Sequence, residues 1–221
     1  MRLLTFVSST ACIVALAVSA TAQTKTVDLR FGPVWPRDLL DSEKATAWDA
    51  AVGYGITVDR VVGFGIAADF MWNRNEKTET IGDNFQVPYQ EIATYMFPLS
   101  GFIVLDPVPD LVVRPVLRFA VGYNSLIYNY DIDTSLSDEQ SDQVDPDGYY
   151  YGLYLKPSLE AAYNFTEAAG VYAGLEYQWA KTKSAKEYSI EDSDQPGTYR
   201  TARRVYNMSG LGLRMGLRLH M

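Results

Sequence analysis

Charged residues recur at alternate positions in several stretches of this sequence, opposite apolar residues on the other parity. Acids and bases both occur among them, as Lys156 and Glu160 illustrate. A β-strand sends successive side chains to opposite faces, so these charges would share one face. Burying a charge costs free energy unless the charge is paired, which predicts either an ion-pair network or a path for ions. The residues expected on this charged face are Asp28, Arg30, Asp49, Asp69, Arg114, Arg118, Lys156, Glu160, Glu176, Arg214 and Arg218.

Enzymatic and metal chemistry have few candidates. A hydrolytic serine needs an adjacent general base, usually histidine, and the only histidine is His220, next to the last residue. With one histidine and one cysteine, a transition-metal site is not expected. The acidic run 131–147 is typical of a solvated loop, although Asp145 and Asp147 form a turn that could hold Ca²⁺ weakly. We therefore predict no catalytic residues, no cofactor and no firm metal site.

The elements that position the charges are indicated most clearly by residues 205–221. From Leu211 to Met221 apolar residues occupy one parity, while glycine, arginine and histidine occupy the other. Such alternation indicates a β-strand, and this one is longer than the average of about 5–6 residues. A strand that crosses a membrane at a tilt needs about 9–11 residues, apolar toward lipid. The stretch therefore predicts the closing strand of a transmembrane barrel.

Seven further alternating segments precede it, at about 27–35, 48–56, 62–72, 87–105, 113–123, 151–163 and 171–179. Pro98 and Gly101 make the fourth segment the least regular, and we expect a bulge or a break there. Long polar loops follow the odd-numbered segments and short turns follow the even-numbered ones, as in outer-membrane barrels with short periplasmic turns. The predicted fold is all-β, an eight-stranded antiparallel up-and-down transmembrane β-barrel.

Residues 1–22 have the features of a cleaved secretory signal peptide. Arg2 is followed by an apolar run at 13–18 and by small residues that end at Ala22. Cleavage would remove Cys12, the only cysteine, and leave residues 23–221 as one barrel domain. The formal net charge of −8 for the whole chain argues against nucleic acid as a partner.

All four tryptophans lie on the apolar parity, near the long-loop ends of their segments: Trp35, Trp48, Trp72 and Trp179. Barrels place aromatic girdles at membrane interfaces, where one side of the ring is apolar and the other is wet. We therefore expect these residues to form a girdle at the outer interface. The alternative is a soluble β-sandwich or lipocalin-like barrel, whose core would have no reason to collect all four tryptophans at one end.

With its signal peptide, eight segments and girdle, the chain resembles the small eight-stranded outer-membrane proteins of the OmpA/OmpX/OmpW-like superfamily. The resemblance covers the whole mature chain and rests on architecture rather than on a unique motif. It implies residence in the bacterial outer membrane, among its lipid and lipopolysaccharide. It also implies that the barrel-insertion machinery reads the C-terminal strand, here Leu217, Leu219 and Met221. Such barrels usually end in an aromatic residue, whereas this chain ends in methionine.

The interior of an eight-stranded barrel is just wide enough for side chains, so we predict a largely filled lumen and a non-enzymatic role. That role would be structural, or would depend on contact between the extracellular loops and an envelope or surface protein. One alternative is a narrow pore for small or apolar solutes, as the OmpW-like branch suggests. A lipid-modifying hydrolase is a second alternative, disfavoured because His220 would lie in the leaflet opposite to lipid A.

Overall fold

The computed structural model describes residues 23–36, 46–58, 60–81, 85–132, 148–191, 199–203 and 205–221. Its strands are β1 (Gln23–Pro36), β2 (Ala47–Val58), β3 (Val62–Ile81), β4 (Phe85–Leu105), β5 (Val113–Ile132), β6 (Gly148–Asn164), β7 (Ala169–Ser184), β8 (Tyr188–Glu191), β9 (Tyr199–Ala202), β10 (Val205–Asn207) and β11 (Gly210–His220). Among the described residues, no helix is long and apolar enough to cross a membrane.

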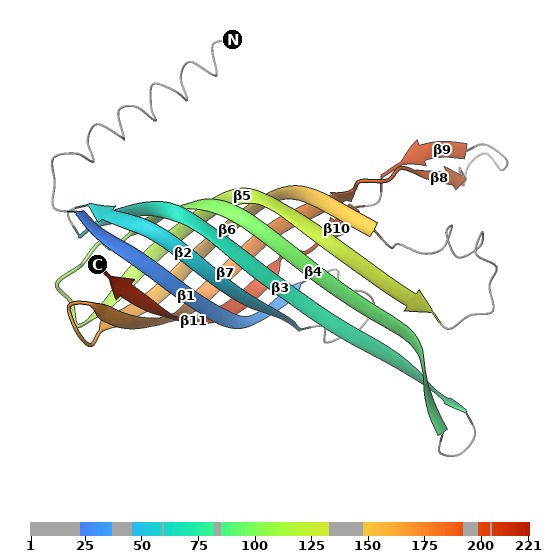
Figure 1. The fold of residues 1–221 in the computed structure, drawn as a ribbon, viewed down its shortest axis with the longest axis horizontal. Helices are drawn as coiled ribbons and strands as arrows, with labels where there is room; N and C mark the ends of the chain where they lie inside the picture. Colours follow the sequence, from blue (N-terminus) through green and yellow to red (C-terminus); the bar gives the residue numbers. More distant parts are fainter. Residues whose placement is uncertain are drawn as a thin grey trace, which may run out of the picture.

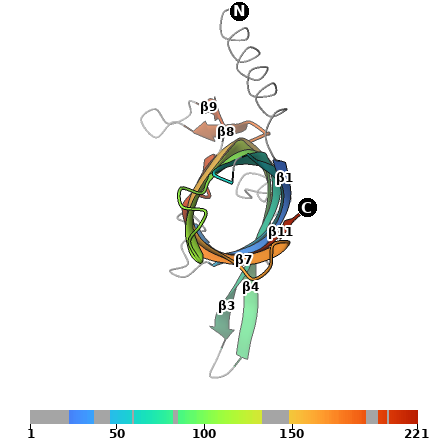
Figure 2. The same cartoon turned by 90° about the vertical axis from the view of Figure 1, so that its left-hand side faces the viewer.

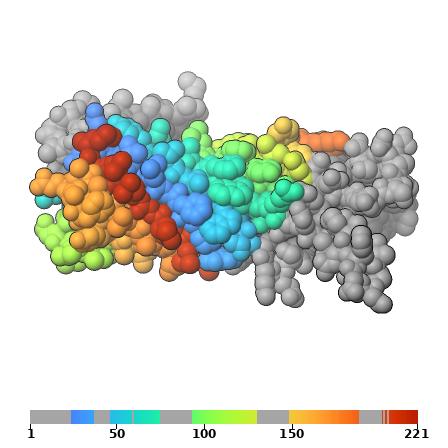
Figure 3. Space-filling view, turned by 60° about the horizontal axis from the view of Figure 1, so that its bottom comes forward, coloured from blue at the N-terminus to red at the C-terminus, as the bar shows by residue number. Residues whose placement is uncertain are grey.

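The long strands close into one barrel. They pair antiparallel in the order β1 to β7 and then β11, which returns to β1. Figure 3 shows this closing seam, with β11 in dark red between β7 in orange and β1 in blue. β10 pairs with β7 in the same register as β11, so the two form one barrel strand that is interrupted at Met208 and Ser209. These pairings confirm the predicted eight-stranded antiparallel barrel, which Figure 2 shows as a closed ring.

The pairing register determines how the strands tilt. We followed the paired residues from strand to strand once around the barrel. The path starts at Thr24 on β1 and comes back to β1 at Val34, so the strands are staggered by ten residues per turn of the barrel. With about 3.3 Å per residue and about 4.8 Å between strands, this stagger corresponds to a tilt of about 40°. The tilt brings side chains that are far apart in sequence to the same level of the lumen.

The two ends of the barrel differ. At one end, short turns connect β2 to β3, β4 to β5 and β6 to β7. Lys25 and Met221 also exchange backbone hydrogen bonds there, at 3.1 and 2.8 Å. At the other end β3 and β4 continue as a paired ribbon beyond the ring, and β8 pairs with β9 (Figures 1 and 2). We call these the short-turn end and the long-loop end.

Two expectations about β3 and β4 are wrong. The polar stretch 73–86 is predicted as a loop, but β3 and β4 pair with each other out to Ile81 and Phe85. Polar composition does not prevent this, because the two strands satisfy each other's backbone groups. The expected bulge or break at Pro98 and Gly101 does not occur either. The register is the same on both sides of Pro98, and the shift lies further out, at Lys77 and Thr78.

Side chains alternate between the lumen and an apolar outer wall. Along β6, Lys156 and Glu160 are buried, whereas Leu159 between them is 53% exposed. Along β11 and the residue that follows it, the outward apolar positions run from Leu211 to Met221. At this tilt the stretch is about 25 Å high, the height of the apolar band of an outer-membrane barrel. An apolar wall around a charged interior is suited to lipid, not to water. This excludes the soluble alternative.

Candidate functional site

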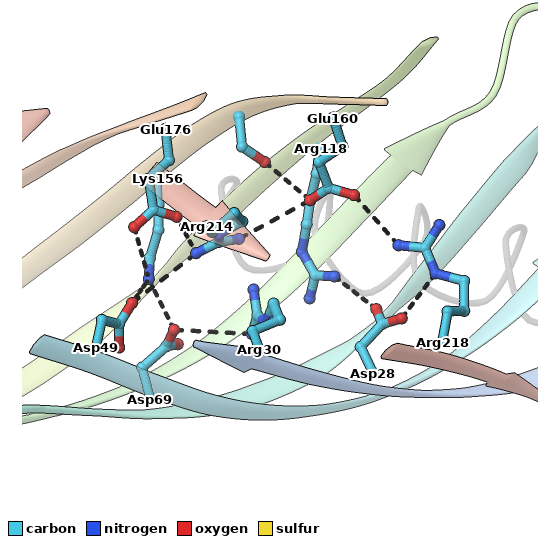
Figure 4. A network of polar contacts seen from close by, with 11 residues as sticks. Asp28, Arg30, Asp49, Asp69, Arg118, Lys156, Glu160, Glu176, Arg214 and Arg218 are labelled. Atoms are coloured by element: carbon cyan, nitrogen blue, oxygen red, sulfur yellow. Dashed lines mark hydrogen bonds and ion pairs between the residues drawn. The ribbon is translucent and has the colours of Figure 1, made fainter. Parts of the chain in front are cut away.

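Ten charged side chains from the barrel strands are packed inside the lumen (Figure 4), and each is at most 8% exposed. Five are acids and five are bases, so the set carries no net formal charge. Buried charges are tolerated when they are paired, and this balance allows every one of them a partner of opposite sign. The set consists of Asp28, Arg30, Asp49, Asp69, Arg118, Lys156, Glu160, Glu176, Arg214 and Arg218.

Lys156 on β6 is the centre of one half of this network. Its Nζ donates hydrogen bonds to Asp49 Oδ2 and Asp69 Oδ1, both at 2.7 Å. Glu176 Oε1 lies 3.8 Å from the same nitrogen, and Arg30 Nη2 lies 3.7 Å from Asp69 Oδ1. One ammonium group thus holds carboxylates from β2, β3 and β7 together across the barrel.

Asp28 on β1 is the centre of the other half. Arg118 Nη1 and Arg218 Nε each donate a hydrogen bond to this carboxylate at 2.7 Å. Arg218 Nη2 also lies 3.3 Å from Glu160 Oε2. The guanidinium of Arg118 stacks over the ring of Phe102, 3.6 Å from its centroid, which is a favourable cation–π geometry. These contacts connect β1, β4, β5, β6 and β11.

Arg214 joins the two halves. Its guanidinium contacts Glu176 and lies 3.9 Å from both Asp49 Oδ2 and Glu160 Oε1. The contacts drawn in Figure 4 therefore form one network that crosses the lumen. Through Arg214, charged side chains from opposite sides of the barrel are engaged with one another across the lumen.

A second closure lies on the long-loop side of the network. Tyr206 stacks on Tyr128 with ring centroids 4.8 Å apart, and meets Tyr150 edge-on at 4.9 Å. Gln178 Nε2 lies 3.5 Å from Met71 Sδ. We call this cluster the lumen plug; its members are Val34, Ala47, Met71, Met96, Leu126, Tyr128, Tyr150, Tyr154, Ala180, Tyr206 and Met208. All but Tyr206 are at most 2% exposed, so the plug fills this part of the lumen.

Arg114 does not join the network, although it shares the inward parity. It lies near the short-turn end because β5 begins at Val113. There its Nη1 donates to Asp106 Oδ2 at 2.6 Å, and its Nη2 donates to Asn164 Oδ1 at 2.8 Å. Burial raises the pKa of Asp106 above its usual value, and the charge of Arg114 only partly offsets this effect. Arg114 also lines an open cavity of about 480 Å³, together with Arg218 and His220.

The register locates the four residues of the expected aromatic girdle. Trp48 pairs directly with Trp72, and the outward rings of Phe31 and Phe70 stack on these two, each at 5.2 Å. When the ten-residue stagger is taken into account, the four tryptophans lie at nearly the same height along the barrel axis, within roughly 3 Å of one another. This level is at the long-loop end of the apolar wall and contains Trp35, Trp48, Trp72 and Trp179.

The residues expected to signal insertion lie at the short-turn end of β11. Leu219 and Met221 are 36% and 67% exposed on the outer wall, and Leu217 is half-buried. Their recognition by the insertion machinery stays a prediction. Asp145 and Asp147, like the expected signal peptide 1–22, lie outside the described residues.

Sequence reasoning missed the lumen plug. Tyr128 and Tyr150 lie just beyond the expected strand ends at 123 and 151, but β5 continues to Ile132 and β6 begins at Gly148. Parity was the available signal, because Tyr128 has the parity of Arg118 and Tyr150 has that of Lys156. Extending the alternation past the girdle would have placed both rings in the lumen.

The sequence matches no protein-family model, and no curated protein matches it. Solved structures of outer-membrane proteins resemble the fold, among them the following three. The major outer membrane protein of Thermus thermophilus has a TM-score of 0.53 at 12% identity, over 90% of this chain and 100% of that one. Neisserial surface protein A (89% and 96% covered) and OprG from Pseudomonas aeruginosa (91% and 97%) both have a TM-score of 0.49 at 15% identity. By its fold and by the apolar belt of its wall, the chain is an eight-stranded transmembrane β-barrel, similar in fold to the Thermus thermophilus outer membrane protein.

Proposed function

We propose that this protein is a non-enzymatic outer-membrane barrel with a closed lumen, whose role is structural or is exerted through its long-loop end. The observation that carries the proposal is the double closure of the lumen. A neutral ion-pair network crosses the barrel, and the lumen plug follows it on the long-loop side.

An ion that crossed the barrel would have to disrupt both layers. Separating one partner from a buried ion pair costs about 3–5 kcal/mol, and Lys156 and Asp28 each hold two partners at 2.7 Å. Beyond the network, an apolar constriction opposes wetting. The two layers therefore oppose permeation by different physical means.

The long-loop end supports a role in surface contact. The β3–β4 ribbon extends beyond the ring (Figure 2) and presents paired backbone outside the apolar belt. Arg203, which follows the β8–β9 hairpin, attaches this segment to the barrel. Its Nη1 lies 2.8 Å from the hydroxyl of Tyr151 on β6, and its Nε lies 3.3 Å from Glu187 Oε1. Such anchored hairpins are suited to binding an envelope or surface protein.

A narrow pore is the second candidate, because the open cavity at the short-turn end shows that one mouth of the lumen is not filled. The hydrolase alternative has weaker support. His220 lies beside this cavity at the short-turn end, whereas lipid A occupies the leaflet at the long-loop end.

Single-channel recording in planar bilayers, combined with heat-modifiable gel migration, tests the proposal. We expect refolded protein to show the heat shift without steady conductance. Arg118→Ala and Glu160→Ala should each introduce transient leak currents, because each removes contacts of the network and leaves the lumen plug as the only intact layer. Arg203→Ala removes an exposed guanidinium and serves as the control. Steady wild-type conductance that Arg118→Ala or Glu160→Ala abolishes would establish the pore instead.

A further inference from the structure

Two lysines lie on the outer wall just beyond the aromatic girdle. On β7 the outward parity continues from Trp179 to Lys181 and Lys183, and both lysine side chains are exposed. With about 3.3 Å per residue and a tilt of about 40°, the two lysines lie about 5 and 10 Å beyond Trp179 along the barrel axis. The head-group region on each side of a bilayer is about 5–8 Å thick. On their flexible stems, both ammonium groups therefore reach the lipid head groups at the long-loop end.

The protein does not neutralise these two charges. Neither Lys181 nor Lys183 has an ion-pair partner within the described part of the chain. The acid that follows them in sequence, Glu187, is engaged by Arg203, whose Nε lies 3.3 Å from Glu187 Oε1. Arg203 is in turn held by the hydroxyl of Tyr151 at 2.8 Å, and Tyr151 is paired with Lys183 in the register. The two lysines thus remain an uncompensated positive pair on a chain whose formal net charge is −8.

The strands on both sides of the lysines present apolar side chains to the lipid. Leu153 on β6 is paired with Lys181 and is 62% exposed. Val205 on β10 is paired with Lys183 and is 55% exposed. The positive charges therefore stand at the margin of the apolar wall, with apolar surface directly beside them. This arrangement suits a ligand that carries an anionic head group on acyl chains.

We propose that Lys181 and Lys183 bind a phosphate group of lipid A, the phosphorylated glycolipid of the outer leaflet, while an acyl chain lies against Leu153. The two lysines leave the same face of β7 about 7 Å apart, so both ammonium groups can reach one phosphate. A phosphate monoester carries a charge of about −1.5 to −2 at pH 7, more than the phosphodiester of an ordinary phospholipid. The inference rests on the long-loop end facing outward, as in the proposed function, and does not depend on whether the lumen conducts.

Native mass spectrometry of the refolded barrel in detergent micelles tests this site, with lipid A, phosphatidylglycerol and phosphatidylcholine as the probes. We expect one lipid A per barrel to bind most tightly, with phosphatidylglycerol at least about five-fold weaker and phosphatidylcholine at least about ten-fold weaker. Lys181→Gln and Lys183→Gln should each weaken lipid A binding by about five-fold, and the double variant by about 30-fold.

Lys25→Gln is the matched control. Lys25 is also exposed and pairs with Ile56 of the outer wall, but it lies at the short-turn end. We expect this variant to bind lipid A as the wild-type protein does. The heat shift on gels reports that each variant is folded.

Three results would overturn the assignment. Equal binding of phosphatidylglycerol or phosphatidylcholine would show that the site does not select lipid A. Lipid A binding that the double variant leaves unchanged would show that the lipid binds elsewhere. A loss in Lys25→Gln as large as that in the double variant would show that overall charge, and not this site, attracts the lipid. The comparison of the three lipids on wild-type protein stands even if a variant fails to fold, and steady conductance would overturn the closed lumen without affecting this site.

Discussion

Replacing Lys156 with methionine removes the ammonium group that Asp49 and Asp69 share at 2.7 Å. Methionine keeps most of the volume, so the change is mainly one of charge. Five lumen acids would then face four bases. Because the Lys156 side chain is only 1% exposed, water cannot solvate the carboxylates in its place. Breaking a buried pair in this way costs about 3–5 kcal/mol, a large part of a typical stability of about 5–15 kcal/mol.

A second substitution separates charge from packing. In Lys156→Met with Asp49→Asn, four acids face four bases, and Asp49 gives up only one further contact, with Arg214 at 3.9 Å. We expect the double variant to recover more than half of the loss. Urea unfolding in phospholipid vesicles, followed by tryptophan fluorescence and gel migration, measures the free energy of unfolding of the single and the double variant. Arg203→Met breaks the exposed pair with Glu187 and should cost less than about 1 kcal/mol.

Two results would refute this reasoning. A loss below about 1 kcal/mol in Lys156→Met would show that the lumen is wet enough to solvate the freed carboxylates. A double variant no more stable than the single one would show that shape, and not charge balance, makes Lys156 important.

Two further predictions concern the seam and the C-terminus. Gly216→Ala would place its Cβ 2.4 Å from Leu29 O and from Tyr172 Cζ, and should lower the free energy of unfolding by about 1–3 kcal/mol. In Gly101→Ala the new Cβ meets no atom closer than 3.8 Å, and the free energy of unfolding should change by less than about 0.5 kcal/mol. Equal urea midpoints for the two variants would contradict this prediction. Met221→Phe should increase the heat-modifiable fraction of the protein in vesicles that contain the insertion machinery, but not in vesicles of pure lipid. If the fraction does not increase in the vesicles with the machinery, the machinery does not recognise the terminal residue.

The faces of the strands could be predicted from sequence because the side-chain alternation of a strand is local. Period two alone put Lys156 and Glu160 on the inner face and Leu159 on the outer one, and these residues lie there. Strand ends were less predictable. Beyond the membrane no lipid requires an apolar face, so the polar ribbon of β3 and β4 carries no alternation that marks it as a strand.

Which charges meet depended on the tertiary structure, because no local pattern encodes the stagger of a closed barrel. Arg218 and Asp28 are 190 residues apart in sequence, yet β11 and β1 are neighbours and place them in direct contact. The stagger of ten residues decides which level each side chain occupies, and so separates Arg114 at the rim from Arg118 in the network. It also leaves the cavity beside His220 open at the short-turn end and places the lumen plug on the opposite side of the network. Composition and parity determined which residues line the lumen. The closure of the sheet depends on contacts between distant parts of the chain, and it determined which of these residues form ion pairs.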